Sequence, residues 1–204
     1  GIVGWGEAQS PVSPNTTATI IKDIVEPLTI GKDIYDVESI WHNNYSSKRE
    51  RGHYTGFYID AICGVDIAIW DAIGKSLNMP TCKAMGGAHR KSVALYNGIG
   101  GTEPEEVADQ AEWSVSKGYK FVKMHLKENL EKDIEIARKV RERVGDSIGI
   151  MIDVHMGFDT FNVIKLGKEL EKLNLLWIES PSDPTDIPGL CEISRSLDIP
   201  IANG

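Results

Sequence analysis

Three successive apolar segments of the chain end in polar side chains that can bind a metal or transfer protons. These side chains are Lys123, His125, Asp153, His155 and Glu179. A charged group in an apolar setting is costly unless it is paired, hydrogen-bonded or bound to a metal. Carboxylates are the hard oxygen ligands that Mg²⁺ prefers, and lysine and imidazole groups can transfer protons. The pattern indicates a metal site beside proton-transfer groups, with ion pairing at the rim of a sheet as the alternative.

The elements that must position these residues alternate regularly in the second half of the chain. A capping box of Thr102 and Glu105 is expected to open the first of its helices. Single helices between strands imply parallel βαβ units, which fit either an open doubly wound sheet or about half of a (β/α) barrel. The pattern predicts strands at 93–96, 121–125, 148–153, 175–179 and 199–202, and helices at about 103–117, 130–144, 159–172 and 185–197.

In a parallel barrel the carboxyl ends of all strands lie on one face, where the chemistry takes place. Period-two alternation places Lys123 and His125 on the same side of their strand, and we expect Asp153 and His155 to share a side as well. Asp153 and Glu179 should approach a common point as ligands of Mg²⁺, and a third ligand is expected from elsewhere. The set suggests abstraction of a proton next to a carboxylate, with the metal stabilising the enediolate.

The first part of the chain has a different pattern. We expect residues 1–88 to form a separate unit, mostly helical with leading strand residues, and residues 89–204 to form consecutive parallel strands with outer helices. Because the sequence opens and closes on strand-like segments, we also expect it to be part of a longer protein. The pattern predicts a strand at 1–10, helices at 16–27 (with Pro27 past its end), at 36–45 and from 57 to about 80, and a polar, mobile loop at 46–56.

Composition narrows the classes of partner. The 204 residues have a net charge of −8, which disfavours nucleic acid because phosphate binding needs an excess of Lys and Arg. No apolar run approaches the ~20 residues of a membrane span. The three scattered cysteines, Cys63, Cys82 and Cys191, are interpreted as buried thiols in a reducing compartment. We therefore expect a cytoplasmic protein that acts on a small molecule.

Specific motifs resemble the enolase superfamily, in its mandelate racemase and muconate-lactonizing branch. The resemblance covers essentially the whole chain. It rests on "GIVGWGEA" near the start, on the helix and junction "GVDIAIWDAIGKSLNMPTCKAMGG", and on four segments around strand ends, "VKMHL", "MIDVHMGFD", "LLWIESPSDPTDIPGL" and "IPIANG".

This resemblance implies an α+β capping domain, here 1–88, on a (β/α)₇β barrel, of which 89–204 would be the first half. It implies that Asp153 and Glu179 are metal ligands, with the third ligand just after Gly204. Lys123 and His125 occupy the positions of the family's K-x-K motif, and His125 replaces the lysine that is usually the base. His155 replaces the usual Asn, and Asp-x-His on this strand looks like the sugar-acid dehydratases of the family.

The resemblance favours a Mg²⁺-dependent dehydratase acting on a sugar acid. His125 would take the α-proton, His155 would donate a proton to the departing β-hydroxyl, and the charge of Lys123 would lower the pKa of His125. The alternatives are a racemase, epimerase or cycloisomerase of the same superfamily, or a non-catalytic homologue. We expect a homo-oligomer, specificity residues partly in 46–56, and no activity from this chain alone. The sequence does not define which sugar acid is used.

Overall fold

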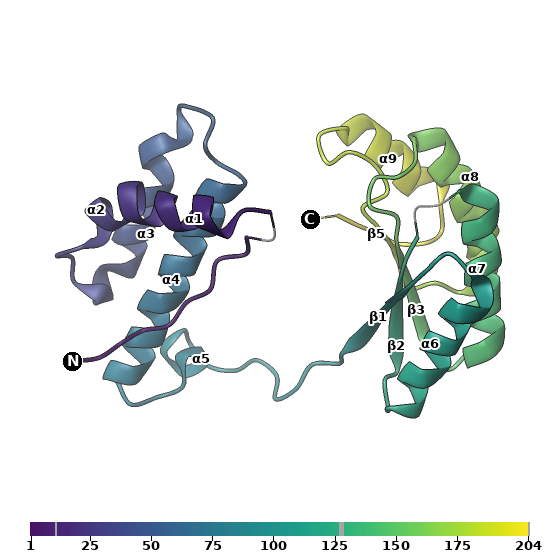
Figure 1. The fold of residues 1–204 in the computed structure, drawn as a ribbon, viewed down its shortest axis with the longest axis horizontal. Coiled ribbons are helices and arrows are strands. Elements are labelled where there is room, and N and C mark those ends of the chain that lie inside the picture. Colours follow the sequence, from purple (N-terminus) through teal and green to yellow (C-terminus); the bar gives the residue numbers. More distant parts are fainter. Residues whose placement is uncertain (11, 127–128, 204) are drawn as a thin grey trace. The chain divides into compact units, whose positions relative to one another are not determined.

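The computed structural model describes residues 1–10, 12–126 and 129–203. They form two compact units, Gly1–Lys91 and Ser92–Gly204 (Figure 1). Apolar clusters lie within each unit, one large cluster in the second and two small ones in the first.

The first unit is helical and is organised around one long helix, α4 (Phe57–Ser76). One face of α4 packs against the segment around Val25, and a second stretch of it packs against α3. The other elements are α1 (Pro14–Ile20), a π-helical segment (Ile21–Val25), α2 (Glu26–Thr29), a 3₁₀ turn (Ile34–Asp36), α3 (Val37–Arg49) and α5 (Thr81–Ala84).

The N-terminal segment does not form the predicted strand. Residues 1–10 have no regular secondary structure and lie along α4. The Trp5 backbone N–H donates to the Asp71 carboxylate at 2.7 Å. A Cβ on Gly4 or Gly6 would collide with a backbone carbonyl of α4, so glycine is what permits the close approach. The prediction was wrong because this extended segment finds its partner in a helix rather than in a described strand.

Other boundaries also differ from the prediction. Pro27 lies within α2 rather than past a helix end, because α2 continues directly from the π-helical segment. Helix α3 continues to Arg49, which shortens the predicted loop. The capping box of Thr102 and Glu105 is not formed, because the helix starts one residue later with Glu103 at the cap position and no side-chain cap bond.

The cysteine prediction was also wrong. Cys82 and Cys191 are exposed and Cys63 is only partly buried, so none of the three free thiols belongs to an apolar core. Within the part of the chain that the structure describes, no helix combines the length and the apolar character needed to cross a bilayer.

The second unit is an α/β fold with one parallel sheet. Its strand order follows the chain, β1-β2-β3-β4-β5, and every neighbouring pair is parallel. The strands are β1 (Tyr96–Gly100), β2 (Phe121–His125), β3 (Gly149–Asp153), β4 (Ile178–Glu179) and β5 (Ile201–Ala202). The helices are α6 (Pro104–Ser116), α7 (Leu130–Val144), α8 (Thr160–Leu170), followed by a 3₁₀ turn (Glu171–Leu173), and α9 (Ile187–Ser196).

The strand order decides between the two architectures left open by the sequence. A doubly wound sheet reverses its strand order at a switch point, and its helices cover both faces. Here the order is sequential, and α6, α7 and α8 lie on one side of the sheet (Figure 1). With right-handed crossovers this is the arrangement of consecutive units of a (β/α) barrel, so the second unit is a partial barrel.

The core lies between the sheet and its helices. Met124 of β2 and Ile152 of β3 are fully buried there. Because alternate residues face opposite sides of a strand, Lys123 and Asp153 are directed to the other face. The first strand begins at Tyr96, where the prediction ended it, because pairing with Phe121 rather than the apolar run before it sets the register.

A buried guanidinium ties together the segments that precede β3 and β4. Arg141 of α7 is buried, and its nitrogens donate to backbone carbonyls at distances between 2.7 and 3.2 Å. The acceptors are Gly145, Ile148, Leu173 and Asn174. These carbonyls would lose their partner if the guanidinium were removed, and an unpaired buried acceptor is costly.

Arg141→Met is therefore expected to lower the free energy of unfolding by about 3 kcal/mol. Urea unfolding followed by circular dichroism measures this. The matched control is Arg138→Met, on the same helix, which removes a half-exposed ion pair with Glu169. The control should cost less than about 1 kcal/mol. Equal effects of the two substitutions would contradict a structural role of the buried guanidinium.

Candidate active site

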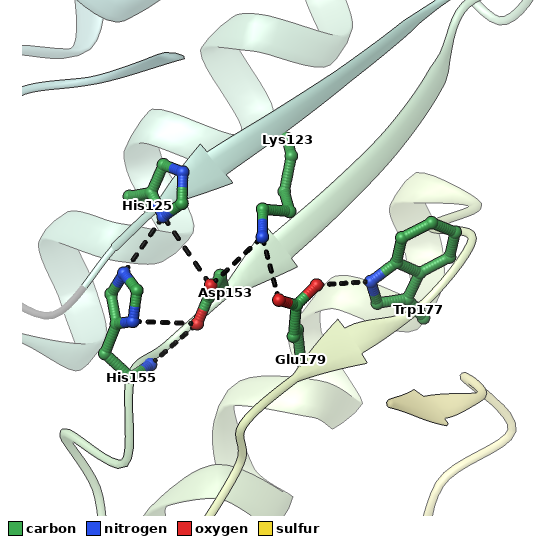
Figure 2. Close-up of polar contacts among 6 residues, drawn as sticks. All are labelled: Lys123, His125, Asp153, His155, Trp177 and Glu179. Atoms are coloured by element: carbon green, nitrogen blue, oxygen red, sulfur yellow. Dashed lines mark hydrogen bonds and ion pairs between the residues drawn. The ribbon is translucent and has the colours of Figure 1, made fainter. Parts of the chain in front are cut away.

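The sheet register aligns polar side chains across three strand ends. His125 at the end of β2 is paired with Asp153 at the end of β3, and Asp153 is paired with Glu179 at the end of β4. Figure 2 shows these side chains together with Lys123, which lies two residues before His125 on β2. The carboxyl ends of parallel strands thus bring together residues that are far apart in sequence.

Lys123 joins the two carboxylates. Its Nζ donates to Asp153 Oδ2 at 3.2 Å and to Glu179 Oε1 at 2.8 Å. The Lys123 and Asp153 side chains are almost fully buried, whereas Glu179 is partly accessible. Two carboxylate oxygens within 3.2 Å of one nitrogen atom converge on a common point, as the sequence led us to expect.

This pairing keeps the groups charged. Burial acts to lower the pKa of Lys123, but hydrogen bonds to Glu179 and Asp153 outweigh it and the pKa is raised above its ordinary value. Burial acts to raise the pKa of Asp153, but hydrogen bonds from the His155 backbone N–H and from Lys123 hold that pKa below its ordinary value. An ionised carboxylate at the end of β3 is the form that can bind a cation.

Lys123→Met is expected to destabilise the chain by about 3 kcal/mol at neutral pH, because it leaves the Asp153 carboxylate buried without its cation. The folded-state pKa of Asp153 lies below its ordinary value, so the stabilisation is present above the ordinary Asp range and is lost as the pH falls through the folded-state pKa. Urea unfolding at several pH values should show the difference from wild type shrinking on acidification. The exposed control Lys120→Met should change little at any pH. A pH-independent difference would contradict this account.

Two imidazoles lie beside this pair. His125 Nδ1 is 2.9 Å from His155 Nε2, and His155 Nδ1 is 3.2 Å from Asp153 Oδ1 (Figure 2). The two rings are nearly parallel, with centroids 5.0 Å apart. One nitrogen must donate and the other accept in the contact between the rings, so at least one ring is neutral. The arrangement can therefore take up one proton and give up another.

His155 reaches this position by a route that alternation did not predict. Strand β3 ends at Asp153, and the backbone at His155 (φ 46°) and Met156 (φ 59°) is left-handed. The direction of the ring is therefore set by a turn and not by a continuation of the strand. In this turn the His155 N–H donates to the Asp153 carboxylate at 3.0 Å. The Met156 N–H also donates to the Ser180 carbonyl at 2.8 Å, which connects this turn to the end of β4.

The pKa of His125 lies below its ordinary value. Burial contributes most, and the positive charge of Lys123 contributes next, while Asp153 opposes them. The expected effect of Lys123 is confirmed in direction, although burial is the larger cause. A depressed pKa leaves more of this imidazole unprotonated near neutral pH, which is the form that accepts a proton.

The donor atoms suit two kinds of cation. Asp153 and Glu179 offer converging carboxylate oxygens, a set that suits Mg²⁺. Separately, His125, Asp153 and His155 each offer one ligand atom within 4.8 Å of the others. Nitrogen-containing sets suit Zn²⁺ and related metals rather than Mg²⁺. The carboxylates of Asp153 and Glu179 therefore fit a magnesium ion by their donor chemistry.

Three neighbours of the site were missed from the sequence. Trp177 Nε1 donates to Glu179 Oε2 at 3.1 Å, and strand alternation two residues before Glu179 would have found it. The Lys123 ammonium lies 5.5 Å from the centre of the Tyr96 ring, and Gly98 leaves room beside the His125 ring. These two were missed because the first strand was placed too early in the sequence.

Comparisons with known proteins identify the family of the chain. Residues 1–86 match the family model "Mandelate racemase / muconate lactonizing enzyme, N-terminal domain", and residues 106–204 match "Enolase C-terminal domain-like". A crystal structure of a Sinorhizobium meliloti protein superposes with a TM-score of 0.94 and 34% identity, covering 100% of this chain and 53% of that one.

Three curated relatives have related but different activities. The L-talarate/galactarate dehydratase of Salmonella typhimurium is 34% identical over 90% of this chain and 46% of its own length. The arabinonate dehydratase of Saccharolobus solfataricus is 30% identical over 99% and 55%, and the D-galactarolactone cycloisomerase of Agrobacterium fabrum is 29% identical over 100% and 54%. The chain spans about half the length of these relatives. It belongs to the mandelate racemase and muconate lactonizing enzyme family of the enolase superfamily.

Proposed function

We propose that the whole protein is a Mg²⁺-dependent dehydratase of a sugar acid. The proposal rests above all on one observation: two imidazoles lie 2.9 Å apart beside a buried carboxylate that shares a lysine with a second carboxylate. A dehydration needs a base at one carbon and an acid at the next, and adjacent rings are suited to adjacent carbons. Relatives that dehydrate talarate, galactarate and arabinonate support the same substrate class.

In this proposal Asp153 and Glu179 would hold the magnesium ion, with a further ligand from outside the described residues. When bound, the ion would supply positive charge to a substrate carboxylate and so acidify its α-proton. The Lys123 ammonium, which lies between the two carboxylates, adds a second positive charge at the same place. The fit rests on the convergence of two carboxylate oxygens.

The chain's own residues would then move two protons. The neutral His125 ring takes the α-proton, and the electron pair of the C–H bond forms a carbon–carbon double bond. The bond to the β-hydroxyl breaks at the same time or afterwards, and His155 donates a proton so that water leaves. The enol product rearranges to a 2-keto-3-deoxy acid. Each imidazole step is expected to contribute about 10²- to 10⁴-fold to the rate.

The second candidate is a cycloisomerase, because one relative of similar identity isomerises a galactarolactone. Both reactions begin with removal of a proton next to a carboxylate, so the metal and His125 would have the same roles. They differ in what leaves the β-carbon and in whether water is lost.

A screen of aldonates and aldarates with the whole protein tests the proposal. Formation of a 2-keto acid, detected with semicarbazide, is expected for at least one substrate in the presence of Mg²⁺ and not after chelation. A keto acid formed from a galactarolactone without loss of water, seen as an unchanged mass, would instead favour the cycloisomerase.

A further inference from the structure

We infer that His125, His155 and Asp153 form a second cation site, which takes Zn²⁺ or a similar borderline metal and competes with proton transfer. The site shares Asp153 with the proposed magnesium site but not Glu179, which lies outside this cluster. The inference deepens the proposed function, on which it rests for the statement that the two rings transfer protons.

The distances between donor atoms are those of a metal site. Ligand atoms around a tetrahedral zinc ion lie about 3.3 Å from one another, given bond lengths of about 2.0–2.2 Å. His125 Nδ1 is 2.9 Å from His155 Nε2 and 3.6 Å from Asp153 Oδ2. Three protein ligands and one open position are the pattern of zinc sites that exchange with solvent.

The surroundings also suit an ion that enters from solvent. The side chains of His125 and His155 are 41% and 45% exposed, so a cation can reach them without unfolding. The Asp153 carboxylate is held in place by the His155 backbone N–H and by Lys123. Such supporting hydrogen bonds fix a ligand's direction and typically change metal affinity by about 10- to 100-fold.

Donor chemistry separates the two cations. Magnesium prefers oxygen ligands and binds imidazole poorly, whereas zinc binds imidazole nitrogen well. A zinc ion here would engage the lone pairs of both rings and one carboxylate oxygen. The coordinated nitrogen of each ring could then neither accept nor donate a proton, so zinc would inhibit the proposed dehydration, whereas magnesium supports it.

The experiment titrates the whole protein with Co²⁺, whose visible absorption reports four-coordinate nitrogen and oxygen ligands, and then displaces it with Zn²⁺. His125→Asn and His155→Asn are each expected to weaken binding about 100-fold. Glu179→Gln should change it less than about threefold, because Glu179 lies outside the cluster. The control His89→Asn alters an exposed ring in the first unit and should have no effect.

Magnesium binding by the whole protein, measured by calorimetry, should show the opposite dependence. It should be lost in Glu179→Gln and kept in His125→Asn and His155→Asn. If both histidine variants bind Co²⁺ as tightly as wild type, or if Glu179→Gln weakens Co²⁺ as much as they do, the zinc site is refuted. If Co²⁺ and Zn²⁺ binding depends on the two histidines as expected but Mg²⁺ affinity is unchanged in Glu179→Gln, the proposed magnesium-dependent function fails and the zinc site stands.

Discussion

Asp153→Asn is expected to lower the affinity of the whole protein for Mg²⁺ by at least ~100-fold and to abolish its activity. The substitution removes the ionised donor that burial and two hydrogen bonds hold at the end of β3. Loss of a charged ligand should exceed the 10- to 100-fold effect that is typical of losing a supporting partner. Calorimetric titration with Mg²⁺ measures the affinity directly.

The matched control for this substitution is Asp146→Asn, which neutralises an exposed carboxylate in the loop before β3. It makes the same change of net charge, so it separates ligation from the general electrostatic attraction of cations. Its titration should match that of wild type. An Asp153→Asn protein that still binds Mg²⁺ with unchanged affinity would show that this carboxylate is not a ligand.

His125→Asn and His155→Asn are expected to fail at different steps of the reaction. Without His125 the α-proton should no longer exchange with deuterated solvent, because the ring with the lowered pKa is the proposed base. Without His155 that exchange should persist while loss of the hydroxyl slows by about 10²- to 10⁴-fold. Proton NMR of the substrate follows exchange and elimination in one sample.

The exposed ring His89 again provides the control, since His89→Asn should leave both steps unchanged. Equal loss of exchange in the two active-site variants would mean that the rings act as one unit, which their 2.9 Å contact permits. If both His125→Asn and His155→Asn dehydrate substrate at the wild-type rate, neither histidine takes part in the mechanism.

The sequence was informative where one physical rule dominates. Apolar runs that end in charged residues located β2 and β3 almost to the residue, because a charged side chain is costly in an apolar core and therefore marks the polar end of a strand. Parallel pairing then brought Lys123 close to Asp153 and Glu179. The charged ends of the strands, rather than helix or strand propensity, were the reliable signal.

It was less informative where tertiary contacts override local pattern. The alternating residues of 1–10 predicted a strand, yet glycines allow that segment to lie on α4. His155 shows a second limit: its ring reaches the site through a left-handed turn that neither helical nor strand periodicity describes. In that turn the His155 N–H donates to the Asp153 carboxylate and the Met156 N–H donates to the Ser180 carbonyl, which only the folded chain brings close.

The most direct test of the central claim is the mass and labelling of products formed from sugar acids by the whole protein in deuterated water with Mg²⁺. The account predicts a product that has lost one water and gained a solvent deuterium at the carbon next to the new keto group. Products that have not lost water, with deuterium only at the α-carbon or at a ring-opened position, would show a racemase, epimerase or cycloisomerase. That result would contradict the dehydratase proposal.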